Sequence, residues 1–273
     1  MLVLHPIKTV FLHVPKCSGK EVRKVFQDSF AENEVQALWG YEYSNILHRY
    51  VDLAHLPLSD LRNYEEFYSY LDRYHVIACV RNPYYRLPSA VNEYYRQLSS
   101  RHAAKANKGR LSRLDRERYY LRLIRRHAQQ DPRFIHSLPI YYFTHHGTKP
   151  KVDTLLRCER IRSDFLALGT ERSWPSSLLD LAASCLQDRP AEMNNAPMKG
   201  REKRLCNQMY AVDFQTFGYE MSTLSSDRLP LQANHDYLKD YFLPISRHVA
   251  WHGGAKKLNQ FPEKLQPVRL GSL

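Results

Sequence analysis

Residues 75–80, HVIACV, form an apolar run in which hydrophobic and polar residues do not alternate. A strand with one face in water alternates, whereas a strand covered on both faces of a parallel sheet is apolar throughout. Asn82 and Pro83 follow, a pair typical of a helix N-cap and the first helical position. The segment therefore predicts a buried strand and then a helix to about residue 98, with a bend at Pro88.

Residues 7–14, IKTVFLHV, predict an earlier strand because they are rich in β-branched and aromatic side chains. Pro15 ends this strand, and apolar residues at helical spacing predict a helix over residues 20–30. A third strand is expected over residues 152–158. Further helices are expected over residues 64–72, 116–129, 160–168, 176–186 and 201–216. This order predicts an α/β three-layer sandwich whose central, mainly parallel sheet is flanked by helices.

The chain has 273 residues, of which 43% are hydrophobic, so it can bury a substantial core. We expect one domain over residues 1–220 and a partly ordered C-terminal extension over residues 221–273. Residues 99–133 read as a basic loop and helix inserted in that domain. The net charge is +12, and residues 101–133 alone carry eleven Lys or Arg against three acidic residues. This balance favours anionic partners.

Five widely spaced cysteines without a CxxC pair argue against a zinc site or a disulfide scaffold. The N-terminal residues lack a signal-peptide layout, and no window approaches the ~20 apolar residues of a membrane span. We therefore expect a cytoplasmic protein without a transmembrane segment, and a peripheral membrane contact is compatible with the basic charge.

The segment FLHVPKCSGKEV, residues 11–22, places a turn between the first strand and its helix. A helix N-terminus attracts phosphate through its unpaired N–H groups and its dipole, and Lys16 adds a positive charge. Gly19 allows the backbone to approach a ligand closely. The segment is not a Walker A loop, because Val14 and Glu21 replace the required Gly and Ser or Thr. The alternative is an ordinary loop with a surface lysine.

The segment RNPYYRLPS, residues 81–89, begins at the carboxyl end of the second strand, where ligands bind in open α/β sheets. The Arg81 guanidinium suits a fixed phosphate because it binds oxygen atoms in pairs. Ser89, in the following helix, can offer a hydroxyl to the same anion. A purely structural role for Arg81 is the alternative.

Together these two segments resemble the carbohydrate sulfotransferase family, which uses the donor PAPS (3′-phosphoadenosine 5′-phosphosulfate). The first is similar to the family's 5′-phosphosulfate loop, and the second to its 3′-phosphate segment. Two weaker similarities follow, VDTLLRCERIRSDF at residues 152–165 and MYAVDFQTFGYE at residues 209–220. The resemblance spans about residues 8–220 and implies a P-loop-like sulfotransferase architecture.

The resemblance implies that PAPS is the donor, that its product PAP is released, and that no metal is needed. The donor-binding residues that it implies are Pro15, Lys16, Cys17, Ser18, Gly19, Lys20, Glu21, Arg81, Ser89 and Lys199. Lys199 would close over the 3′-phosphate together with Gly200. Glu21 departs from the family, which has a hydroxyl there, and Ser18 and Lys20 are the candidates to replace it. Cys17 is expected to pack.

Sulfuryl transfer needs a group that stabilises the leaving phosphate and a base that takes the acceptor proton. The resemblance implies that Lys16 fulfils the first role. It also implies that a base lies between the two motifs, where His55 is the first candidate and His48 the second. Glu159 is a further candidate, with a structural ion pair as its alternative role. His13 is expected to be structural, hydrogen-bonded beneath the loop.

The resulting hypothesis is a bacterial cytoplasmic sulfotransferase that acts on a hydroxyl of a carbohydrate, glycolipid or polysaccharide. An anionic acceptor would bind the basic stretch. A kinase-like P-loop protein is the first alternative, but it lacks Walker A and a clear magnesium aspartate. A nucleic-acid-binding protein is the second; it would explain the basic stretch and not the two phosphate motifs, so we expect no nucleic-acid partner.

Overall fold

The computed structural model describes residues 1–46, 49–98, 111, 132–189, 198 and 200–222. The chain forms two compact units, and each is described by itself. Unit 1 comprises Met1–Gly40, Leu53–Tyr85 and Ile140–Ala196, and unit 2 comprises Tyr41–Asp52, Arg86–Pro139 and Pro197–Leu273. Among the described residues, no helix is long and apolar enough to cross a membrane.

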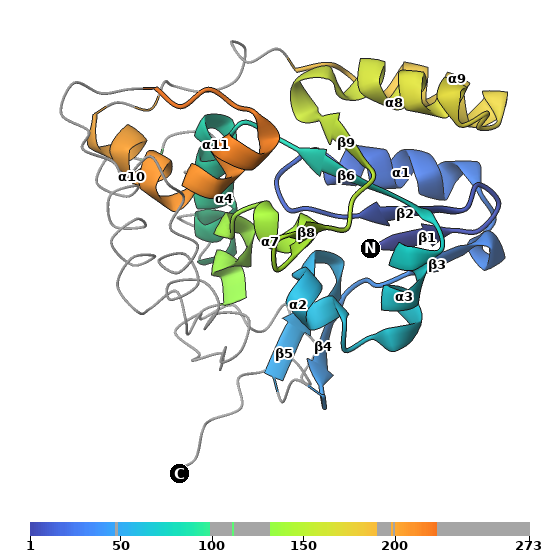
Figure 1. Cartoon of the computed structure of the whole chain (residues 1–273), viewed down its shortest axis with the longest axis horizontal. Helices are drawn as coiled ribbons and strands as arrows, with labels where there is room; N and C mark the ends of the chain where they lie inside the picture. The colour runs from blue at the N-terminus through green and yellow to red at the C-terminus, as the bar shows by residue number, and fades with distance from the viewer. Residues whose placement is uncertain (47–48, 99–110, 112–131, 190–197, 199, 223–273) are drawn as a thin grey trace. The chain divides into compact units, whose positions relative to one another are not determined.

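Unit 1 is built on a five-stranded sheet with the strand order β3-β1-β2-β6-β9 (Figure 1). The strands are β1 (Leu2–Leu4), β2 (Thr9–Leu12), β3 (Val35–Ala37), β6 (His75–Val80) and β9 (Thr154–Arg157). The predicted strands β2, β6 and β9 are neighbours and run parallel. Their carboxyl ends therefore meet at one edge of the sheet, where α/β proteins bind ligands.

The sheet is mixed, which corrects the expectation of a mainly parallel one. Strand β1 pairs antiparallel with both β2 and β3. Each of β1 and β3 has only three residues, too short for a periodic pattern to be read from the sequence. The chain reverses between β1 and β2 through a turn in which Lys8 has a φ of 44°.

Helices cover both faces of β2. On one face Phe11 contacts Phe26 of α1 (Gly19–Ser29), with ring centroids 5.9 Å apart. Phe26 in turn contacts Phe165 of α8 (Ile161–Glu171) and Trp174, which precedes α9 (Ser176–Cys185). On the other face a cavity of about 10 Å³ is lined by residues of β2, η2 (Leu53–His55), α2 (Leu58–Leu61) and α7 (Tyr141–Thr144).

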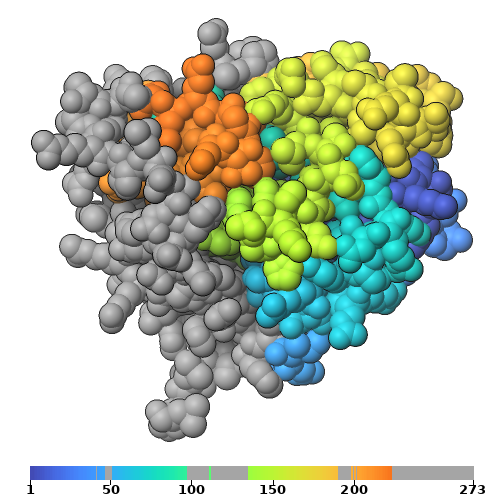
Figure 2. Space-filling model, in the orientation of Figure 1, coloured from blue at the N-terminus to red at the C-terminus, as the bar shows by residue number. Residues whose placement is uncertain are grey.

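Two short segments of unit 1 lie side by side on its surface (Figure 2). One holds α3 (Glu65–Ser69) and η3 (Tyr70–Asp72), in agreement with the helix predicted over residues 64–72. The other holds the strands β7 (His145–His146) and β8 (Lys149–Pro150). Tyr68 Oη lies 3.0 Å from His146 Nδ1, and Lys151 forms an ion pair with Asp72 at 2.6 Å.

Unit 2 contains the antiparallel hairpin β4 (Tyr41–Ser44) and β5 (Arg49–Asp52), most of α4 (Pro83–Leu98), and η5 (Pro132–Ser137). The single helix predicted over residues 201–216 is two helices, α10 (Arg201–Met209) and α11 (Ala211–Phe217). The break falls at Tyr210, which is buried and donates a hydrogen bond of 2.7 Å to the Ser137 carbonyl. The predicted helix over residues 116–129 and the C-terminal extension beyond residue 222 lie outside the described residues.

Candidate functional site

The turn between β2 and α1 alternates in backbone conformation. Lys16 and Ser18 have φ angles of 66° and 59°, whereas Cys17 and Gly19 keep negative φ. Such alternation points successive N–H groups to one side and forms a concave nest that binds anions. A non-glycine residue with positive φ is energetically costly, and such residues cluster at functional sites. The backbone of this turn is therefore a candidate anion cradle.

Ser18 occupies the N-cap position of α1, but its side chain makes no cap hydrogen bond. Its Oγ lies 2.8 Å from the Sγ of Cys158, which follows β9. The first N–H groups of a helix have no acceptor within the helix. Here the Glu21 N–H donates to the Ser18 carbonyl at 3.2 Å, so the N–H groups of Gly19 and Lys20 and the positive end of the helix dipole are the ones suited to hold an anion.

Gly19 packs directly against the ring of His13. A Cβ atom at Gly19 would lie 2.1 Å from Cδ2 of His13, closer than real contacts allow. The His13 ring is buried and stacks on the Trp39 ring, with ring centroids 5.8 Å apart. The Arg23 guanidinium lies over the Trp39 ring. Burial lowers the pKa of His13 well below its usual value, and the electrostatic interaction with the nearby His55 imidazole lowers it further. His13 is therefore a neutral, structural residue under the turn.

The hydrogen bond expected from the His13 ring is not seen at Nδ1, and the main chain of His13 makes one instead. Its Nδ1 has no partner among the described residues. Instead its main-chain carbonyl accepts a hydrogen bond of 3.0 Å from Nδ1 of His55. His13 thus supports the turn by packing and through its backbone.

Arg81 joins the second motif to the first. It follows β6 directly, and its Nη1 donates to the carbonyl oxygen of Lys16 at 3.4 Å. The two residues are half-buried, and 65 positions of sequence separate them. The carboxyl end of β6 therefore brings a guanidinium to the candidate anion cradle.

The third parallel strand also contributes to this edge. Glu159, which follows β9, accepts a hydrogen bond of 2.9 Å from the main-chain N–H of Asn82. Asn82 Oδ1 accepts one of 3.0 Å from the N–H of Tyr84, which is the N-cap geometry predicted for α4. Glu159 thereby ties the turn after β9 to the turn after β6.

An ion pair that the sequence did not predict lies at the first turn of α1. Arg189 Nη2 lies 2.6 Å from Glu21 Oε1. The two residues are 168 positions apart, and no local pattern connects residues at that distance. Lys20, the other expected ligand of this turn, is exposed.

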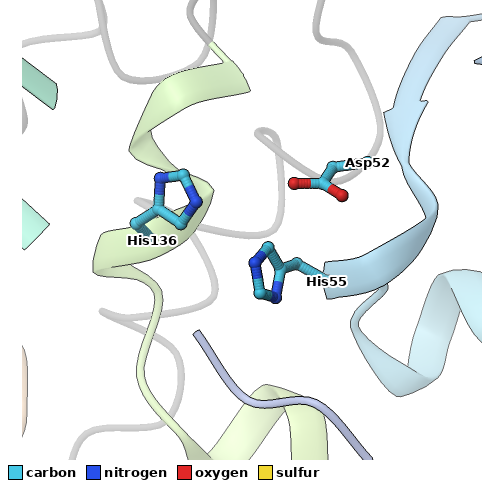
Figure 3. Close-up of side chains that lie close together, drawn as sticks. All are labelled: Asp52, His55 and His136. Atoms are coloured by element: carbon cyan, nitrogen blue, oxygen red, sulfur yellow. The ribbon is translucent and has the colours of Figure 1, made fainter. Parts of the chain in front are cut away.

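His55, the first candidate for the base, is buried in η2, and Figure 3 shows its ring. Because Nδ1 donates to the His13 carbonyl, the neutral ring carries its proton on Nδ1. Nε2 is then the atom that can accept a proton. Asp52 and His136, also drawn in Figure 3, belong to unit 2, and their carboxylate and imidazole atoms lie within 4.8 Å of each other.

The structure leaves some predicted residues untested. Ser89 is half-buried in the part of α4 that belongs to unit 2, whereas the turn and Arg81 belong to unit 1, so their convergence stays a prediction. Lys199, His48 and nearly all of the basic stretch lie outside the described residues. Pro15 and Cys17 are buried in the turn, and Cys17 Sγ donates to the Pro15 carbonyl at 3.6 Å, in keeping with the packing role expected of Cys17.

Comparisons of the chain with protein-family models, with curated proteins and with solved structures gave no match.

Proposed function

We propose that this chain is a sulfotransferase that transfers the sulfuryl group of PAPS to a hydroxyl of a carbohydrate or glycoconjugate. The hydrogen bond from Arg81 to the Lys16 carbonyl carries the proposal. It joins the two motifs that resemble the donor-binding segments of sulfotransferases, at the carboxyl ends of adjacent parallel strands. The nest and the N-terminus of α1, which has no side-chain cap, add backbone donors suited to a phosphosulfate.

The chemistry requires little beyond positioning and charge. The acceptor oxygen attacks sulfur in line, the bond between sulfur and the bridging phosphate oxygen breaks, and PAP leaves. Lys16 stabilises the negative charge that develops on the leaving phosphate. His55 Nε2 takes the proton of the acceptor hydroxyl, so the products are a sulfate ester, PAP and one proton on the enzyme.

The acceptor side of the proposal rests on charge. The basic stretch at residues 101–133 favours an anionic glycan, glycolipid or polysaccharide, because positively charged patches raise the local concentration of anions. Transfer of radiolabelled sulfate from PAPS to a panel of such acceptors identifies the class. The kinase-like and nucleic-acid-binding alternatives predict instead that ATP or DNA binds in preference to PAP.

Replacing Arg81 with alanine tests the donor site. The substitution should weaken PAP binding by about 2 to 4 kcal/mol, as expected when a charge-assisted contact to a phosphate is removed. Isothermal titration calorimetry with PAP measures the effect directly. The matched control is Arg73→Ala, since Arg73 precedes the same strand, β6, at its opposite end, where it contacts Ser69 and the Tyr70 ring.

The two variants separate a specific contact from a general loss of positive charge. Arg73→Ala should bind PAP as the wild type does. If folded Arg81→Ala protein keeps wild-type affinity for PAP, the donor-site assignment is wrong.

A further inference from the structure

The first turn of α1 contains a carboxylate where an anion is expected to bind. Glu21 is the third residue of the helix. A carboxylate at this position interacts favourably with the helix dipole, yet it repels a phosphate or sulfate bound at the same helix end. A site for an anionic donor therefore needs a group that offsets Glu21.

Two contacts, one of its side chain and one of its backbone, hold Arg189 beside Glu21. Its Nη2 lies 2.6 Å from Glu21 Oε1, with both side chains partly exposed. Its main-chain N–H donates a hydrogen bond of 3.1 Å to the carbonyl oxygen of Glu159, in the turn after β9. The backbone anchor fixes the start of the side chain, and the ion pair fixes its end.

The same guanidinium also acts on Cys158, a side chain in contact with the N-cap residue of α1. Cys158 precedes Glu159, and its Sγ lies 2.8 Å from the N-cap hydroxyl of Ser18. Burial raises the pKa of Cys158, and the positive charges of Arg81 and Arg189 both act against that rise. Both arginines therefore act electrostatically on this thiol, which contacts the N-cap residue of α1.

We propose that Arg189 is a further donor-binding residue, whose guanidinium contacts the anionic group held at the N-terminus of α1. Glu21 is its positioning residue. A guanidinium has five N–H donors in a planar fork, so one can bind a carboxylate while others bind a phosphate or sulfate oxygen. This inference rests on the proposed function, because it assigns Arg189 to the same PAPS site.

Replacing Arg189 with alanine measures its contribution to donor binding. The variant should bind PAP at least about tenfold more weakly than the wild type, as expected for loss of a charge-assisted contact. Arg189→Lys keeps the charge but loses the planar fork of donors, so its PAP affinity should lie between those of the wild type and Arg189→Ala. It replaces the alanine variant in the test if that variant does not fold. Lys151→Ala is the control, because it breaks an ion pair of the same length, with Asp72, and should leave PAP affinity unchanged.

A double variant distinguishes a direct contact from simple neutralisation of Glu21. In Glu21→Gln/Arg189→Ala the repelling carboxylate is gone together with the guanidinium. If Arg189 contacts the donor, this double variant still binds PAP several-fold more weakly than Glu21→Gln alone. Equal affinity of these two proteins would overturn the assignment, because Arg189 would then act only by offsetting Glu21.

PAP binding by the wild-type protein distinguishes failure of the proposed function from failure of the Arg189 assignment. A wild-type protein that binds no PAP overturns the proposed function and this assignment with it. A wild type that binds PAP, with an Arg189→Ala variant of equal affinity, overturns the role of Arg189 alone.

Discussion

At the scale of single residues, Gly19 is required by the packing of its own turn. The ring of His13 occupies the space that a side chain at position 19 would need. The ring itself has little room to move, because it is buried and stacked on Trp39. The turn thus depends on a glycine for packing, independently of any donor.

Replacing Gly19 with alanine should destabilise the protein by about 1 to 3 kcal/mol, the usual cost of overpacking a buried site. The better helix propensity of alanine, worth at most about 1 kcal/mol, offsets only part of this cost. Urea denaturation measures the change in the free energy of unfolding. In a His13→Ala background the same substitution should cost clearly less, and an equal cost in both backgrounds would contradict the packing explanation.

His55 is the residue whose loss should affect turnover and not donor binding. Removing a positioned general base typically lowers the rate by ~10²- to 10⁴-fold. We expect His55→Ala to lower kcat by this order and to leave PAP affinity within about twofold, because a base on the acceptor contributes little to donor binding.

The control for His55 is His146→Ala, a substitution at an exposed imidazole of the same unit. It should leave kcat unchanged. If His55→Ala loses thermal stability and keeps its specific activity, the residue is structural, and His48 or Glu159 becomes the candidate base.

At the scale of elements, the start of α4 follows from two residues. Asn82 caps the helix through its Oδ1, and Pro83 begins it without needing a hydrogen-bond acceptor for its nitrogen. The main-chain N–H of Asn82 is held by Glu159, so the cap also fixes the turn that carries Arg81.

Replacing Asn82 with alanine should cost about 1 kcal/mol of stability, the usual effect of removing an N-cap side chain. Asn82→Ser keeps an acceptor oxygen at the cap and should restore most of the loss, while both variants retain the N–H that Glu159 binds. Thermal denaturation compares the two. Equal melting temperatures of the alanine and serine variants would show that capping does not contribute.

Elements with a strong local pattern could be predicted from the sequence. The apolar run of β6 and the Asn-Pro start of α4 are examples, and both match the structure at their bounds. The hairpin of β4 and β5 was missed because each strand has only four residues, the shortest run in which alternation can be recognised. The break at Tyr210 was missed because a buried hydrogen bond to Ser137, 73 positions away, decides it.

At the scale of the whole molecule, the edge of the sheet that carries the candidate site could be predicted from the sequence. The long-range side-chain contacts within that site could not. Parallel strands place their carboxyl ends together, so the turn that contains Lys16 and the residue after β6, Arg81, were expected at one edge of the sheet. The partners of Ser18 and Glu21 lie 140 and 168 positions away along the chain. Only the folded structure reveals such pairs.

The same long separations have a consequence for the order in which the protein is made. A ribosome that has released residues 1–98 has already synthesised both segments of the candidate site, residues 11–22 and 81–89. It has not yet synthesised Cys158, Glu159 and Arg189, which hold Ser18, Asn82 and Glu21 in the finished fold. The nascent chain therefore carries the two motifs long before it contains the side chains that hold them in the fold, and the contacts of the candidate site are complete only after residue 189 has been synthesised.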